Sequence, residues 1–149
     1  MISRGNNRGK VTLRVQNGVF WVKLELDPRG EDLVACFSEA RSSGMLAGPM
    51  PTVVDMLTYN GSIDWSAITA IRAMIPWEKQ HHAQIGFRRI VMARCAYVSV
   101  DPLLAPIIKI ICDLFGRMRH RQFRDPAHAL LWVLQSELPP PERVTPNDD

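Results

Sequence analysis

Residues 53–71 read VVDMLTYNGSIDWSAITAI and contain the pattern that decides the fold class. Residues 51–57 form a short apolar run rich in β-branched side chains, which predicts a buried strand. Asn60-Gly61 marks a turn, and residues 62–75 then carry apolar side chains at the spacing of a helix. A strand, a turn and a helix in this order indicate an α/β fold with parallel strand pairs.

Further local signals place the other elements around this unit. Asn17-Gly18 separates two β-rich runs, and this two-residue connection predicts an opening β-hairpin. Asp101-Pro102 and Asp125-Pro126 each predict a helix start, because Asp is a favourable N-cap and Pro suits the first helical position. The expected strands cover 11–16, 19–26, 51–57, 90–100 and 119–123, and the expected helices cover 31–43, 62–75, 102–115 and 126–137. The chain is therefore expected to form a mixed sheet of about five strands, with about four helices mainly on one face.

The composition describes one globular domain without a membrane span. The chain has 149 residues, of which 46% are hydrophobic, and its net charge is +3. This length suits a single domain over residues 1–137, followed by a flexible Pro-rich tail over residues 138–149. The apolar runs are too short to span a bilayer, and no apolar stretch follows the N-terminal residues as in a secretory signal, so a cytoplasmic location is expected. The three widely spaced cysteines lie among apolar neighbours, which indicates reduced, buried thiols.

The sequence lacks the motifs of common enzyme and metal chemistry. It contains neither a phosphate-binding Gly-Lys-Ser/Thr loop nor a Gly-x-Ser-x-Gly nucleophile motif. His81 and His82 are adjacent, so on a regular element they point to different faces, and no further ligands stand at metal-binding spacing. We therefore expect no catalytic activity, no cofactor and no metal. In the enzyme alternative, Asp55 and Asp64 would serve as acid and base.

A basic cluster lies near the end of the domain. It comprises Arg117, Arg119, Arg121 and Arg124, with His120 among them. Such a cluster suits the phosphates of nucleic acids or anionic lipid head groups. It also suits an edge strand that charge protects from aggregation, and the sequence offers no row of aromatic side chains for base stacking. The edge-strand interpretation is favoured, and no nucleic-acid partner is expected.

The expected helix 102–115 is too apolar for a helix that buries a single stripe. On a helical wheel its apolar residues cover more than half of the circumference. Ile107, Ile108, Ile111 and Phe115 belong to this arc. The excess must be covered by neighbouring elements of the same chain, a second subunit, a membrane surface or an apolar ligand.

The start of the helix 62–75 carries an exposed serine. On the helical wheel Ser66 lies away from the apolar stripe, and Trp65 lies on its flank. The helix dipole favours a carboxylate at this end, and Ser62 or Asp64 is the expected N-cap. A phosphate on Ser66 would find the same favourable field.

Two stretches of the sequence resemble a known family. Residues 53–71 resemble the strand-loop-helix signature of STAS domains, and RQFRDPAHALLWVL at 121–134 resembles the closing helix of their SpoIIAA-like branch. The resemblance implies a STAS fold and a non-enzymatic interaction module of the kind found in anti-sigma-factor antagonists. In those antagonists a partner kinase phosphorylates a loop serine, and the matching stretch here is 64–67, with Trp65 where one serine is typical. The SpoIIAA-like branch is also similar in fold to lipid-carrying CRAL-TRIO domains, which implies apolar-ligand binding or membrane association.

These observations predict a cytoplasmic, bacterial binding module of the STAS or SpoIIAA-like type. Its partner is expected to be an apolar ligand, a membrane surface or a protein, including a second copy of the chain in a homodimer. The expected contact surface comprises Trp65, Ile107, Ile108, Ile111 and Phe115. The alternative is a phosphorylation-controlled interaction switch, with Ser66 or, less favourably, Ser62 as phosphoacceptor and Asp55 and Asp64 as supporting acids.

Overall fold

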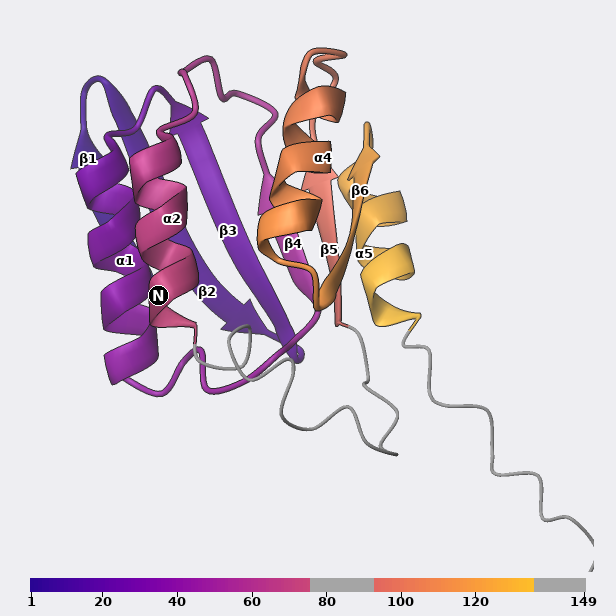
Figure 1. Ribbon diagram of the computed structural model, residues 1–149, viewed down its shortest axis with the longest axis horizontal. Helices are drawn as coiled ribbons and strands as arrows, with labels where there is room; N and C mark the ends of the chain where they lie inside the picture. The colour runs from indigo at the N-terminus through magenta and orange to yellow at the C-terminus, as the bar shows by residue number, and fades with distance from the viewer. Residues whose placement is uncertain (76–92, 136–149) are drawn as a thin grey trace, which may run out of the picture.

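The computed structural model describes residues 1–75 and 93–135 of the chain. Over these residues the backbone forms one sheet with helices on both of its faces (Figure 1). In their order across the sheet, the strands are β1 (Ile2–Asn6), β2 (Gly9–Gln16), β3 (Val19–Leu26), β4 (Thr52–Asp55), β5 (Ala93–Val98) and β6 (Met118–Phe123). The helices are α1 (Gly30–Ser42), α2 (Trp65–Met74), α4 (Leu104–Leu114) and α5 (Pro126–Leu134). The start of the expected strand 90–100, the adjacent His81 and His82, and the expected tail lie outside the described residues.

β1, β2 and β3 form an antiparallel unit at one edge of the sheet. Asn17 and Gly18 adopt φ values of 52° and 75°, as the tight turn between β2 and β3 requires, so the predicted hairpin is confirmed. β1 adds a sixth strand to the five that the sequence places. The sequence did not predict β1 because Ile2 is its single buried residue, which leaves no alternation of apolar and polar side chains.

From β3 onward all neighbouring strands are parallel. The register places Val54 of β4 between Val22 of β3 and Tyr97 of β5. It also places Cys95 of β5 beside His120 of β6. Because side chains alternate between the two faces of a strand, all five residues point to the same side of the sheet. The predicted mixed α/β sheet is therefore confirmed.

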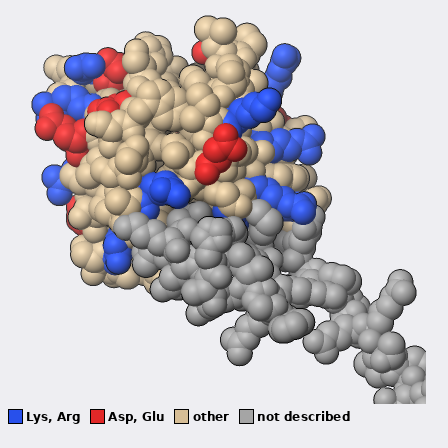
Figure 2. All heavy atoms as spheres, viewed as in Figure 1, with Lys and Arg blue, Asp and Glu red and all other residues tan. Residues whose placement is uncertain are grey.

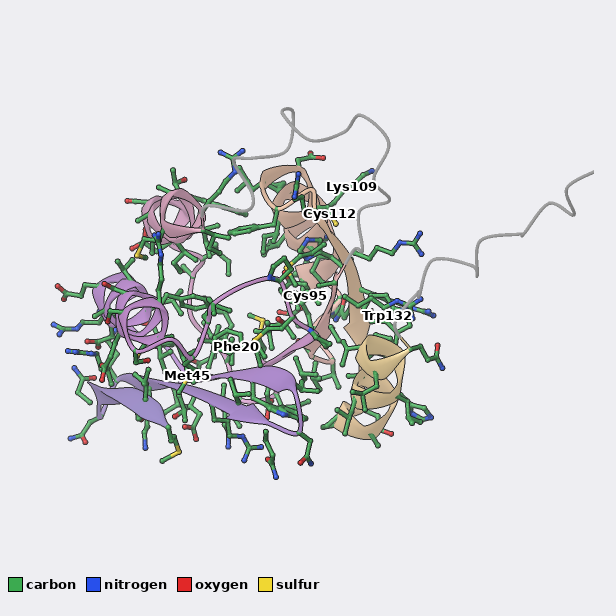
Figure 3. The ribbon with its side chains drawn as sticks, turned by 90° about the horizontal axis from the view of Figure 1, so that it is seen from below. Phe20, Met45, Cys95, Lys109, Cys112 and Trp132 are labelled. Carbon is green, nitrogen blue, oxygen red and sulfur yellow. The ribbon has the colours of Figure 1, made fainter. Side chains whose placement is uncertain are left out.

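Three helices, α1, α2 and α4, cover one face of the sheet, and α5 covers part of the other. In Figure 3, Phe20 and Cys95 lie on the side of the sheet that faces the three helices, whereas Trp132 of α5 lies on the other side. The larger apolar core is on the three-helix side, and a smaller one lies under α5, where Ala129 and Val133 are buried. The predicted placement of helices mainly on one face is confirmed. None of the described helices is long and apolar enough to cross a membrane.

Of the two helix starts predicted from an Asp-Pro pair, one is confirmed and the other differs. Asp125 caps α5 through a bond from the Ala127 amide, and Pro126 is the first helical residue, as predicted. The predicted start of α4 is wrong, because Asp101 instead accepts the Leu103 amide in a turn, at 2.9 Å, and the helix begins later. Pro106 consequently lies in the first turn of α4, where a missing N–H breaks no helical hydrogen bond.

Candidate functional site: an apolar cavity between α2 and α4

An apolar cavity of about 150 Å³ lies between α2, α4 and the central strands of the sheet. Its floor is formed by β3, β4 and β5, and Val54 lies near the middle of this floor. Ile68 and Ile71 line it from α2, and Ile111 and Phe115 line it from the opposite side. Uncharged atoms make up much of the face that carries these helices, and acidic and basic side chains are scattered among them (Figure 2).

The cavity exists because the two bordering helices pack mainly on other elements. α2 packs against α1, whereas α4 packs against β6 at the far edge of the sheet. Figure 1 shows the α1–α2 pair on the left and α4 on the right, with β3 visible between them. At their C-terminal ends the two helices are tied together by Arg72, whose Nε donates a hydrogen bond of 2.6 Å to the carbonyl oxygen of Leu114. The helices therefore border the cavity without closing over it.

A chain of hydrogen bonds lies in the wall of the cavity. Nε2 of His120 is 3.0 Å from the carbonyl oxygen of Phe115, and Nδ1 is 2.9 Å from the Tyr97 hydroxyl. Because a carbonyl oxygen only accepts, Nε2 carries the proton, and in the neutral ring Nδ1 accepts from Tyr97. Burial lowers the pKa of His120, and the bond to Phe115 opposes this only in part, so the ring is neutral at pH 7. The Tyr97 hydroxyl hydrogen is thus directed at His120.

The remaining polar side chains of the lining are held in protonated or bonded states. Burial raises the pKa of the Cys95 thiol to about 12. Burial also raises the pKa of Tyr97 well above its ordinary value. Thr52 donates its hydroxyl hydrogen to the Met50 carbonyl oxygen at 3.0 Å. At neutral pH the cavity therefore contains an uncharged thiol and three uncharged polar side chains with directed hydrogen bonds.

Sequence reasoning assigned His120 to the basic cluster and did not identify Tyr97 at all. In the structure His120 turns inward, while Arg119 and Arg121 on either side of it are exposed. Among the described strands, β6 lies at an edge of the sheet, as the favoured interpretation of the cluster requires. The signal that identifies His120 is the period of two in β6, which puts it on the same face as Met118. Its contact with Tyr97 depends on the β5–β6 register, which no local pattern reveals.

The five residues predicted as a contact surface occupy three different environments. Ile111 and Phe115 line the cavity. Ile108 is buried, and Ile107 is half-buried against the same core, so the chain's own elements cover much of the wide apolar arc of α4. Trp65 is 38% exposed in the first turn of α2 and is not part of the cavity lining. Beyond the predicted set, Leu103 and Ile110 leave an apolar strip on the outer face of α4, being 72% and 49% exposed.

The predicted acids and serines lie at the end of β4 and at the start of α2, and they are not among the residues that line the cavity. Asp64 caps α2, and its Oδ1 accepts the Ala67 amide at 3.1 Å, so the predicted N-cap is confirmed. Asp55 accepts the Leu57 amide at 3.1 Å just after β4. Ser66 is exposed in the first turn of α2, and Ser62 borders an open polar recess beside Asp64. Both carboxylates thus hold local backbone structure.

The polar recess beside Ser62 contains charges of both signs. Arg8 contacts Asp27 at 2.7 Å, and Arg29 contacts Glu31 at 3.0 Å. These pairs neutralise the recess, so it offers no concentrated positive charge to an anion. Among the described residues, no group of three or more His, Cys, Asp or Glu side chains could hold a metal ion.

Comparisons with known proteins identify the fold. The sequence matches no protein-family model, and no curated protein matches it significantly. Among solved structures, the chain is similar to an uncharacterised protein of the DUF3478 family from Shewanella loihica PV-4, which has a SpoIIAA-like fold. The two are 14% identical, and the match covers 87% of this chain and 98% of the other with a TM-score of 0.55. The chain therefore has a SpoIIAA-like fold, as the resemblance of its two sequence stretches predicts.

Proposed function

We propose that this SpoIIAA-like domain is a non-enzymatic binding module that takes an apolar small molecule into the cavity between α2 and α4. The observation that carries the proposal is the cavity itself, an apolar space with two ordered polar side chains, Tyr97 and His120, in its wall. Ligand sites in proteins commonly combine a mainly apolar lining with a few oriented polar groups. We further propose that the domain works in the cytoplasm.

The state of the polar groups supports binding over catalysis. A nucleophilic thiol needs a lowered pKa, whereas that of Cys95 is raised to about 12. Both ring nitrogens of His120 already have hydrogen-bond partners inside the protein. Asp55 and Asp64 accept backbone amides at separate turns. None of these groups is arranged to activate a substrate or to transfer a proton to one.

We assign contact with a membrane surface or a protein partner to the outer face of α4. Leu103 and Ile110 are exposed there, on the helix that also borders the cavity. A ligand released from such a partner would enter the domain next to the contact. A second copy of the chain would bury the same strip in a homodimer, and the two cases differ in the mass measured in solution.

A phosphorylation-controlled switch is the second candidate function, and the exposure of Ser66 favours it. The hydroxyl lies in the first turn of α2, where a phosphate is accessible and meets the positive end of the helix dipole. Pull-down of cellular proteins by the wild type and by Ser66→Glu tests this candidate. Recovery of the same partners in equal amounts by both chains counts against it.

Methyl NMR under xenon pressure tests the binding function. Xenon is a neutral probe of apolar cavities, and we expect it to shift the methyl signals of Ile68, Ile71 and Ile111. Val54→Phe fills the floor of the cavity and should abolish these shifts, whereas Val15→Phe makes the same change at an exposed site and should preserve them. Organic extraction of the purified protein, followed by mass spectrometry, then identifies a natural occupant. Absence of xenon-dependent shifts in the wild type would refute the proposal.

A further inference from the structure

The hydrogen bonding inside the cavity narrows the class of ligand, on the premise that the proposed binding function holds. We propose that the ligand is a neutral molecule about the size of one aromatic ring, whose single polar group is a hydrogen-bond donor received by the Tyr97 hydroxyl oxygen. Three properties of the cavity lead to this assignment: its volume, the direction of its hydrogen bonds and its lack of charge.

The volume sets the size of the ligand. The cavity measures about 150 Å³. An engineered apolar protein cavity of about the same volume stays dry and binds benzene or xenon. Pockets for drug-sized ligands begin at about 300 Å³, which is about twice this volume. A single six-membered ring with one small substituent therefore matches the available space.

The direction of the hydrogen bonds sets the polarity of the ligand. Tyr97 donates to Nδ1 of His120, His120 donates to the Phe115 carbonyl oxygen, and Thr52 donates to a carbonyl oxygen of its own segment. The hydroxyl and imidazole hydrogens of the lining are thus all committed within the protein. The Tyr97 oxygen, which also hydrogen-bonds the Cys95 thiol, and the Thr52 oxygen each keep a lone pair, so a ligand can donate to the lining but finds no strong side-chain donor.

Tyr97 is the better acceptor of the two hydroxyl oxygens. Its bond to His120 is the first of two linked hydrogen bonds that end at the Phe115 carbonyl, and such chains polarise their members. A hydroxyl that donates its hydrogen in this way becomes a stronger acceptor. Thr52 makes only a local bond to Met50, so it provides a matched comparison within the same cavity.

The absence of charge excludes anionic ligands. Within the described ranges 1–75 and 93–135, no Lys, Arg, Asp or Glu lines the cavity. An unpaired carboxylate pays a large desolvation cost in such surroundings. Among the described side chains of the lining, no hydroxyl or imidazole hydrogen is left to bond a carboxylate oxygen. The cavity should therefore discriminate strongly between a phenol and the corresponding benzoate.

A series of three fluorinated probes of similar size tests the assignment by ¹⁹F NMR. The probes are 4-fluorotoluene, 4-fluorophenol and 4-fluorobenzoate, titrated into the full-length protein at pH 7. We expect the phenol and the toluene to bind, and the benzoate to bind at least roughly tenfold more weakly. In the double variant Tyr97→Phe/His120→Leu, which removes the hydroxyl and also the Nδ1 acceptor that its loss would expose, the Kd ratio of toluene to phenol should fall roughly 2- to 10-fold. Thr52→Val should leave this ratio unchanged, and Val54→Phe should abolish binding of both neutral probes.

The outcomes separate this inference from the function on which it rests. Equal binding of benzoate and toluene by the wild type overturns the inference on charge, whatever the variants do. Loss of the phenol preference in Thr52→Val instead of Tyr97→Phe/His120→Leu overturns the assignment of Tyr97. Displacement of xenon by palmitate, with none by the ring probes, overturns the inference on size and leaves the proposed function intact. Failure of xenon and of every probe to bind rejects both.

Discussion

Replacing Tyr97 with Phe should destabilise the fold through one defined loss. The substitution keeps the buried ring and removes the hydroxyl that donates to Nδ1 of His120 at 2.9 Å. The imidazole cannot compensate by moving its proton to Nδ1, because Nε2–H would then be lost to the Phe115 carbonyl oxygen. A buried acceptor left without a partner costs about 1–3 kcal/mol. For a chain of this length, about 2 kcal/mol corresponds to a decrease in Tm of roughly 4–8 °C.

A double-mutant cycle isolates the contribution of this pair. His120→Leu alone leaves both the Tyr97 hydroxyl and the Phe115 carbonyl without their partner. Once Leu is present, adding Tyr97→Phe removes a group that is already unpaired, so the second change should cost little. The free energy of unfolding, measured by urea denaturation, should therefore show a coupling of at least about 1 kcal/mol between the two sites.

Tyr59→Phe is the matched control for the cycle. This tyrosine is half-buried, and its hydroxyl makes no hydrogen bond to the part of the chain that the structure describes. Its loss should change the free energy of unfolding by less than about 0.5 kcal/mol. If the effects of Tyr97→Phe and His120→Leu add to within about 0.3 kcal/mol, the two side chains do not interact and the hydrogen-bond chain is refuted.

Three further predictions concern pH, capping and close packing. Burial lowers the pKa of His120 in the folded state, so the contribution of this side chain to stability should be complete above about pH 6.5 and should decrease as pH falls. If the stability difference between the wild type and His120→Leu stays constant from about pH 7 to 5, this prediction is wrong. Asp64→Ala should lower the free energy of unfolding by about 1 kcal/mol, because the Ala67 amide loses its acceptor. Asp64→Asn should retain most of the stability, and an equal loss of stability in the two variants argues against capping. Gly9→Ala should destabilise the protein by about 1–3 kcal/mol, because the added Cβ would overlap the backbone between β3 and α1. The Cβ added by Gly48→Ala points into open space, so this control variant should keep the wild-type free energy of unfolding, measured by urea denaturation.

Local sequence signals were sufficient for most of the fold. The Asn17-Gly18 turn and the Asp125-Pro126 helix start each depend mainly on adjacent residues, so both form where the sequence predicts them. Asp101-Pro102 has the same local signal, yet the helix begins after Leu103. In that case the Asp101 carboxylate bonds within a preceding turn, and an Asx turn and an N-cap have similar sequence requirements.

The site was predictable only in part, because it depends on which strands become neighbours. Helical periodicity alone identified Ile111 and Phe115, which line the cavity. Tyr97 and His120 are 23 residues apart and meet only because β5 and β6 pair in one particular register. A run of arginines around His120 also suggested a solvated strand, and the period of two inside that run was the weaker signal.

The strand that sequence reasoning missed accounts for the position of the cavity. α1 packs against β1 and β2, so the added edge strand carries this helix toward one side of the sheet. Ile2 of β1 belongs to the same buried cluster as Cys36 of α1, and Arg4 contacts Glu39 at 3.4 Å across the two elements. α2 packs on α1 and is displaced with it, while α4 is held at the opposite edge by β6. The centre of the face is thus left to side chains alone, and at this width they do not fill the space completely.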